Sequence, residues 1–151
     1  MINLFPARYF SVFVIGFLLL TQFSSSAQTS LANEVFAYTN KYRQSKGLAP
    51  LKQHKGLNEI AQKHSEDMAS GKEDFGHSGF KKRGDKVRKI FQSCTMAENV
   101  AYGATTGREV VDQWKESAGH KKNMLGNYTY IGIGVAKDKR GRIYYTQLFV
   151  R

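Results

Sequence analysis

The chain has 151 residues and is strongly basic, with 23 lysine and arginine residues against 12 aspartate and glutamate residues and a formal net charge of +11. A chain of this length suits one ordinary domain and is too short for two. Its single cysteine, Cys94, excludes an internal disulfide and with it the class of small disulfide-built extracellular scaffolds. We expect the Cys94 thiol to be buried.

The start of the chain has the three-part pattern of a secretion signal. Arg8 precedes an apolar run over residues 9–20, and small polar residues follow up to Ala27, where the sequence fits signal-peptidase cleavage. The apolar run is shorter than the roughly 20 residues that a bilayer-crossing helix needs, which favours a cleaved signal over a transmembrane anchor. We predict a signal peptide at residues 1–27, one domain at residues 28–151, and a secreted or periplasmic protein.

The excess of positive charge attracts anionic partners. Cell-wall polymers, acidic lipid headgroups and nucleic acid all fit by charge, and export makes nucleic acid the least suitable of the three. Residues 72–91 are the most charged stretch, and they form either a solvated face or a surface for an anionic partner. We expect a monomer held near anionic cell-envelope material, without a nucleic acid partner.

Apolar residues at helical spacing predict helices in the first half of the domain. One face is formed by Leu31, Val35, Tyr38 and Tyr42, and Gly47 ends this helix. A second helix covers residues 57–68 and is closed by Gly71, with an apolar face formed by Leu57, Ile60, Ala61, His64 and Met68. The weak apolar stripe of Val87, Ile90 and Phe91 indicates a third, short helix.

For two histidines in this half of the domain, the sequence predicts a structural position and not a functional one. His64 falls on the apolar face of the second helix, so we expect a hydrogen-bonded core histidine rather than a ligand. His54 lies in a loop between lysines, so we expect it to be exposed.

The second half of the domain combines one helix with short strands. Residues 96–102 predict a strand, and Thr106 with Glu109 has the form of a capping box that starts a helix. Residues 130–136 and 143–150 predict a hairpin whose aromatic side chains mostly build the sheet core, with Tyr144 and Tyr145 on opposite faces. This order of elements favours an α+β domain with helices packed on a small antiparallel sheet.

Polar residues that could carry chemistry lie in three places: at His77, at Glu98, and at Glu116 with His120. Glu98 is the most informative of them because its strand is otherwise apolar. A buried carboxylate requires a cation or a hydrogen-bond donor beside it, and a histidine fits that role. Strand alternation could instead point Glu98 at solvent.

Taken together, the motifs resemble the CAP superfamily, which includes cysteine-rich secretory proteins, antigen 5 and plant pathogenesis-related proteins. The matching segments, in chain order, are Asn40-x-x-Arg43, Gly47-Leu48-x-Pro50-Leu51, His64-Ser65-x-x-Met68, His77-Ser78-Gly79, Ala97-Glu98-Asn99-Val100-Ala101-x-Gly103, Trp114-x-x-Ser117-x-Gly119-His120-x-x-Asn123-Met124, Ile131-Gly132-Ile133-Gly134 and Gln147-x-Phe149. The chain is most similar to the short bacterial branch, which lacks disulfides.

The resemblance implies a three-layer α-β-α sandwich with a central cavity that holds two histidines and two glutamates. His77, Glu98 and His120 match three of these four residues. The second glutamate of the animal and plant proteins falls at Ser117 of this chain, and Glu116 is one residue earlier. The expected cavity therefore consists of His77, Glu98, His120 and Glu116.

Three interpretations of this cluster remain open. His77, His120 and Glu98 could bind a divalent metal such as zinc, because neutral imidazoles and carboxylates are common zinc ligands. Glu98 or a histidine could act as the general base of a metal-dependent hydrolase of envelope polymers or proteins, although no convincing nucleophile accompanies them. The same residues could form only a buried hydrogen-bonded network. We expect a non-enzymatic binding protein for a metal ion or a small lipid-like ligand, with the hydrolase as the alternative.

Overall fold

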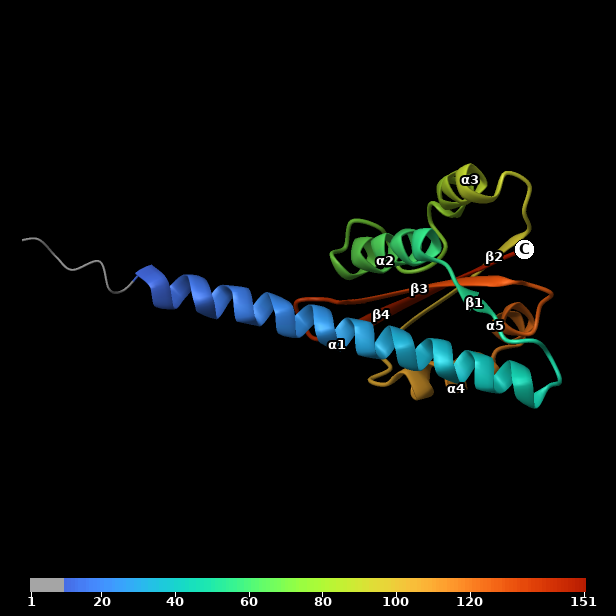
Figure 1. Cartoon of the computed structure of the whole chain (residues 1–151), viewed down its shortest axis with the longest axis horizontal. Helices are drawn as coiled ribbons and strands as arrows, with labels where there is room; N and C mark the ends of the chain where they lie inside the picture. The colour runs from blue at the N-terminus through green and yellow to red at the C-terminus, as the bar shows by residue number, and fades with distance from the viewer. Residues whose placement is uncertain (1–9) are drawn as a thin grey trace, which may run out of the picture.

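A computed structural model describes residues 10–151. The chain folds into three layers, with a sheet between two layers of helices (Figure 1). The elements are α1 (Phe10–Ser45), β1 (Lys52–Gln53), α2 (Lys55–Ala69), α3 (Phe80–Phe91), β2 (Met96–Tyr102), α4 (Gly107–Glu116), α5 (Ala118–Met124), β3 (Tyr130–Lys137) and β4 (Ile143–Val150). The predicted α+β class and the α-β-α sandwich are confirmed.

The sheet has four strands in the order β1-β3-β4-β2. β4 pairs antiparallel with both β2 and β3, and only the two-residue β1 pairs in parallel, with the start of β3. The predicted hairpin is therefore the centre of the sheet, and β2 forms one edge. Tyr144 and Tyr145 lie on opposite faces as expected, since Tyr144 packs with Met68 and Val100 while Tyr145 joins the core cluster of Trp114.

Helix α1 covers one face of the sheet together with α4 (Figure 1). Its predicted apolar stripe packs on the main core cluster, where Val35 is fully buried. The helix ends near the predicted position, because Gly47 adopts the left-handed conformation with φ of +72°. It begins at Phe10 and so runs through the predicted cleavage site after Ala27.

The predicted signal peptide at residues 1–27 stays a prediction, and residues 1–9 of it lie outside the described part of the chain. Within residues 10–151, no helix is long and apolar enough to cross a membrane.

Two glycines of β3 allow helix α2 to lie directly on the sheet. A Cβ atom at Gly132 would lie 2.3 Å from the backbone of Leu57, and one at Gly134 would lie 2.2 Å from the backbone of Ala61. No side chain fits between β3 and α2 at these two positions. The close packing of the helix on the strand therefore explains why glycines alternate with isoleucines in β3.

The capping box is confirmed at the start of α4. The Thr106 hydroxyl accepts a hydrogen bond of 3.1 Å from the Glu109 backbone N–H, and the Glu109 carboxylate accepts one of 2.8 Å from the Thr105 N–H. The carboxylate thus reaches the residue before the cap instead of the cap itself.

Two burial predictions need correction. His54 is half-buried rather than exposed, because its ring packs against Phe91 and Tyr130 at centroid distances of 4.9 and 5.8 Å. Cys94 is half-buried rather than fully buried, and it packs against a small cluster that contains Leu57 and Val87.

Candidate functional site

Glu98 lies in the edge strand β2 and points toward the layer of α2 and α3. It is 5% exposed, so the alternative in which strand alternation turns it toward solvent is wrong. A carboxylate at this depth needs compensating charge and hydrogen bonds.

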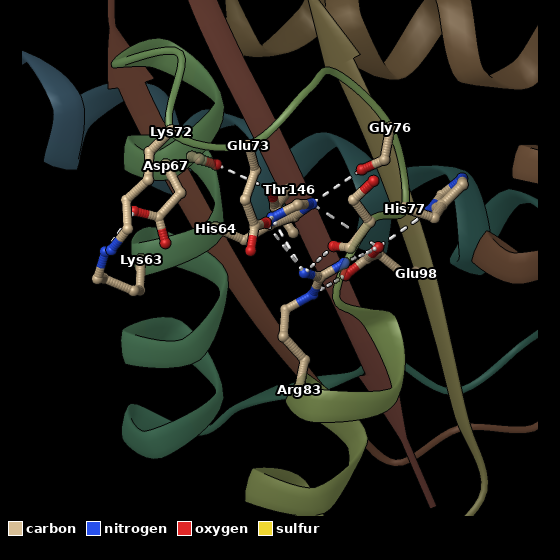
Figure 2. A network of polar contacts seen from close by, with 12 residues as sticks. Lys63, His64, Asp67, Lys72, Glu73, Gly76, His77, Arg83, Glu98 and Thr146 are labelled. Atoms are coloured by element: carbon tan, nitrogen blue, oxygen red, sulfur yellow. Dashed lines mark hydrogen bonds and ion pairs between the residues drawn. The ribbon is translucent and has the colours of Figure 1, made fainter.

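Arg83 of helix α3 supplies that compensation (Figure 2). Its Nε donates to Glu98 Oε2 at 2.6 Å and its Nη2 donates to Glu98 Oε1 at 2.7 Å, the two-pronged geometry of a strong arginine–carboxylate pair. Arg83 is itself 6% exposed. The pair therefore neutralises the charge of Glu98 inside the fold.

His77 contacts the same carboxylate from the loop between α2 and α3. Its Nδ1 lies 2.9 Å from Glu98 Oε1, and because an ionised carboxylate can only accept, Nδ1 carries the proton. Nε2, the other ring nitrogen of His77, has no hydrogen-bond partner among residues 10–151. The His77 side chain is 54% exposed, so its ring is accessible from solvent.

His64 anchors the loop that carries His77. Its Nε2 donates to the Gly76 carbonyl at 2.9 Å, and its Nδ1 lies 3.0 Å from Glu73 Oε2 (Figure 2). Arg83 adds a further bond of 2.7 Å from Nη1 to the Ser78 carbonyl. His64 is thus the hydrogen-bonded core histidine that its place on the apolar helix face predicts.

His120 approaches from the opposite layer, on the short helix α5. This helix is fixed to β2 by two side-chain amides: Asn99 donates to the His120 carbonyl at 3.2 Å, and Asn123 donates to the Glu98 carbonyl at 3.1 Å. Burial lowers the pKa of the His120 imidazole, and repulsion by His77 lowers it further. The ring is therefore neutral at pH 7, and it lies near enough to His77 to sense its charge.

The described residues match the model of the CAP, or cysteine-rich secretory protein, family over residues 36–149. The chain belongs to the CAP family.

Curated relatives carry this CAP domain as part of longer proteins. The chain is 36% identical over 137 residues to the Bacillus subtilis protein YkwD, covering 86% of this chain and 52% of that protein. It is 35% identical over 130 residues to the B. subtilis membrane protein YlbC, covering 82% of this chain and 35% of that protein. The chain therefore spans about half or less of the length of these relatives.

Solved CAP structures agree with the fold. An extracellular protein with an SCP domain from Bacillus anthracis superposes with a TM-score of 0.71 at 27% identity, over 82% of this chain and 41% of that chain. A cysteine-rich secretory protein from Staphylococcus aureus gives a TM-score of 0.66 at 25% identity, over 82% of this chain and 39% of that chain.

Glu116, the fourth predicted cavity residue of this CAP domain, lies on the surface. It is exposed at the end of α4, where it lines a groove with residues that include Arg108, Asp112 and Gln113. Among residues 10–151 it makes no hydrogen bond or ion pair with His77, Glu98 or His120. Ser117, which follows it, is the residue between α4 and α5.

The three predicted metal ligands differ in what they can still bind. Both oxygens of Glu98 are occupied by Arg83 and His77, whereas the two imidazoles keep free nitrogens. In the part of the chain that the structure describes, no group of three or more His, Cys, Asp or Glu residues is arranged to hold a metal ion. The ring nitrogens of His77 and His120 are therefore the donors that remain of the three predicted ligands, and Glu98 is hydrogen-bonded to His77.

Arg83 is the site residue that sequence reasoning missed. It lies in the charged stretch at residues 72–91, for which the sequence predicts either a solvated face or a surface for an anionic partner. A signal was present, because Arg83 precedes Val87 by four residues and so lies on the buried face of the same helix. A buried Glu98 and a cation on an apolar helix face together predict this ion pair.

Proposed function

We propose that the domain is an exported, non-enzymatic binding protein. In this proposal, the site around His77 and His120 holds a divalent metal ion or a small ligand, and the basic surface keeps the protein near anionic envelope material. The predicted export signal and the excess of basic over acidic residues support the location.

The observation that carries the proposal is the fixed orientation of His77. Glu98 holds Nδ1 at 2.9 Å and is itself held by two bonds from Arg83, so the free Nε2 has a defined direction. A carboxylate behind a histidine is the usual support of a metal-ligating imidazole, because it fixes the tautomer and increases the basicity of the ligand. His120, which is neutral at pH 7, supplies the second nitrogen.

The same geometry disfavours Glu98 as the general base of a hydrolase. A general base needs a lone pair directed at its substrate, and both oxygens of Glu98 are already hydrogen-bonded within the fold. Cys94, the only thiol of the chain, packs against the apolar cluster of Leu57 and Val87 instead of the histidines.

Isothermal titration of the mature domain with zinc chloride tests the proposal. We expect His77→Ala and His120→Ala each to weaken zinc binding by about 10-fold or more, because each removes one of two ligands. His54→Ala is the matched control, since it removes a histidine that packs on Phe91, away from the site. An unchanged titration in the His77→Ala/His120→Ala double variant would exclude the metal.

Native mass spectrometry of the same proteins tests the small-ligand form of the proposal. A co-purifying mass that is present in the wild type and lost in the double variant is the expected result. Turnover of labelled peptidoglycan or casein that disappears in His120→Ala would contradict the non-enzymatic assignment.

A further inference from the structure

The outward face of helix α3 carries three lysines in one row. Lys82, Lys86 and Lys89 are exposed and follow one another at i, i+4 and i+7. At a rise of about 1.5 Å per residue, these charges repeat every 4.5–6 Å along the helix axis. The helix lies at the outer side of its layer (Figure 1). We call these residues the lysine row.

The other charges of α3 are already paired. Lys81 and Arg88 both form ion pairs with Asp85, and Arg83 is committed to Glu98. The lysine row has no ion-pair partner within residues 10–151. Like charges at i, i+4 and i, i+3 repel one another and destabilise a helix, and an external anion relieves that repulsion.

The lysine row also lacks the apolar neighbours that a lipid surface requires. A helix that lies in a membrane interface buries an apolar face and presents its basic residues at the sides. The exposed apolar residues of α3 are elsewhere: Phe80 begins the helix, and Ile90 is directed toward Gly56 at the start of α2. Between Lys82 and Lys89, the exposed positions are Asp85, Lys86 and Arg88, and none of them is apolar.

We propose that the lysine row is a docking surface for a linear polyanion, a polymer that carries a phosphate or carboxylate on each repeat. A single file of point charges matches a chain of regularly spaced anions better than a broad bilayer surface. This inference rests on the proposed retention at anionic envelope material, for which it names the surface and the chemistry. It is independent of what His77 and His120 bind.

Equilibrium binding to long-chain inorganic polyphosphate, measured by fluorescence anisotropy at several salt concentrations, tests the inference. We expect the Lys82→Gln/Lys86→Gln/Lys89→Gln variant to bind about 10-fold or more weakly. We also expect its salt dependence to fall by about two to three released counterions, since each lysine–phosphate contact releases roughly one. Circular dichroism establishes that the variant keeps its helices.

The matched control removes the same charge elsewhere. Lys52→Gln/Lys137→Gln/Lys139→Gln changes three exposed lysines away from α3, and its polyphosphate affinity should change by less than about 3-fold. Equal losses in both variants would overturn the docking surface and leave only general retention by net charge. No binding by the wild type would overturn the inference and the proposed retention together.

Two further arms separate the chemistries. Polygalacturonate in place of polyphosphate tests carboxylate against phosphate, and binding of either polymer that depends on the lysine row supports the inference. Phosphatidylglycerol vesicles test the lipid alternative. Binding to vesicles that depends on the lysine row, with no such dependence for either polymer, would overturn the polymer assignment.

Discussion

Arg83 is the residue that compensates the buried charge of Glu98. It donates to both oxygens of Glu98, to the Ser78 carbonyl, and toward His64 Nδ1 at 3.1 Å. One guanidinium thus connects helix α3, the edge strand β2 and the loop that carries His77. A lysine could replace the charge but not this planar set of donors.

Replacing Arg83 with methionine should destabilise the domain strongly. The Glu98 side chain, 1% exposed, would lose the guanidinium that is bound to both of its oxygens, and breaking a buried pair from one side typically costs about 3–5 kcal/mol. The free energy of unfolding from urea denaturation at pH 7 measures this loss. Arg83→Lys should give an intermediate value, because it keeps the charge and loses the two-pronged geometry.

The double variant Arg83→Met/Glu98→Leu is the control for this experiment. It removes both charges together, so it should regain at least half of the stability that Arg83→Met loses. A loss below about 1 kcal/mol in Arg83→Met would show that the pair does not carry the buried charge as the geometry indicates.

Among the elements, side chains hydrogen-bond to the parts of the sheet edge that no strand covers: β3 beyond the two-residue β1, and the edge strand β2. On β3, the Asn58 side chain accepts a hydrogen bond of 2.9 Å from the Ile133 N–H. The Gln62 side-chain amide accepts one of 3.0 Å from the Val135 N–H and donates one of 2.9 Å to the Val135 carbonyl. On β2, the Trp114 indole donates to the Val100 carbonyl at 3.3 Å. Open strand edges pair with other chains, so these contacts keep the sheet from extending.

Gln62→Ala should therefore open the edge of β3. It leaves the Val135 N–H and carbonyl without their partners, which should cost about 1–3 kcal/mol in unfolding free energy. It should also increase self-association, measured by light scattering after size-exclusion chromatography. Glu59→Ala, an exposed change on the same helix, is the control. A Gln62→Ala protein that stays monomeric at high concentration would contradict the protective role.

The helices and strands that the sequence predicted are those marked by a pattern of several residues. The apolar stripe that ends at Tyr42, the capping box at Thr106 and the alternation in residues 130–136 each extend over several residues, so local chemistry fixed their type. β1 has only two residues, too few for an alternation of apolar and polar side chains. α5 has seven residues and no apolar residues at helical spacing. Both form because the finished fold holds them in place.

The candidate site was predictable in part for a similar reason. His77, Glu98 and His120 followed from motifs, and the burial of Glu98 followed from its apolar strand. The partner of that carboxylate did not follow from the sequence. Arg83 lies among other charged residues, and only its position around the helix axis distinguishes it from the exposed ones. The surface position of Glu116 depends on where α4 ends, which is the least predictable property of a helix.

At the scale of the whole molecule, helix α1 begins well before its described contacts with the core (Figure 1). Its first described contacts with the core are made by Leu31 and Ala32, only a few residues after the predicted cleavage site. Further on, Glu34 accepts a hydrogen bond of 2.9 Å from the Gly107 N–H and so caps α4. The predicted cleavage would remove only turns that precede these contacts.

Two truncations test this division of α1. A chain that starts at Gln28 should fold cooperatively, and secreted protein should carry this same N-terminus in mass spectrometry. A chain that starts at Phe36 loses the fully buried Val35 and the Glu34 cap, so its melting temperature should fall by about 10 °C or more relative to the Gln28 start. Equal melting temperatures would contradict the assigned role of residues 28–35.

The two imidazoles of the site reach the edge strand β2 from different layers. His77 belongs to the layer of α2 and α3, whereas α5, which carries His120, buries Met124 in the core shared by α1 and α4. An ion or ligand bound by both would act as a cross-link through the thickness of the sandwich. A chain with one cysteine cannot form an internal disulfide, and a bridge of this kind would join its layers reversibly, in proportion to ligand concentration.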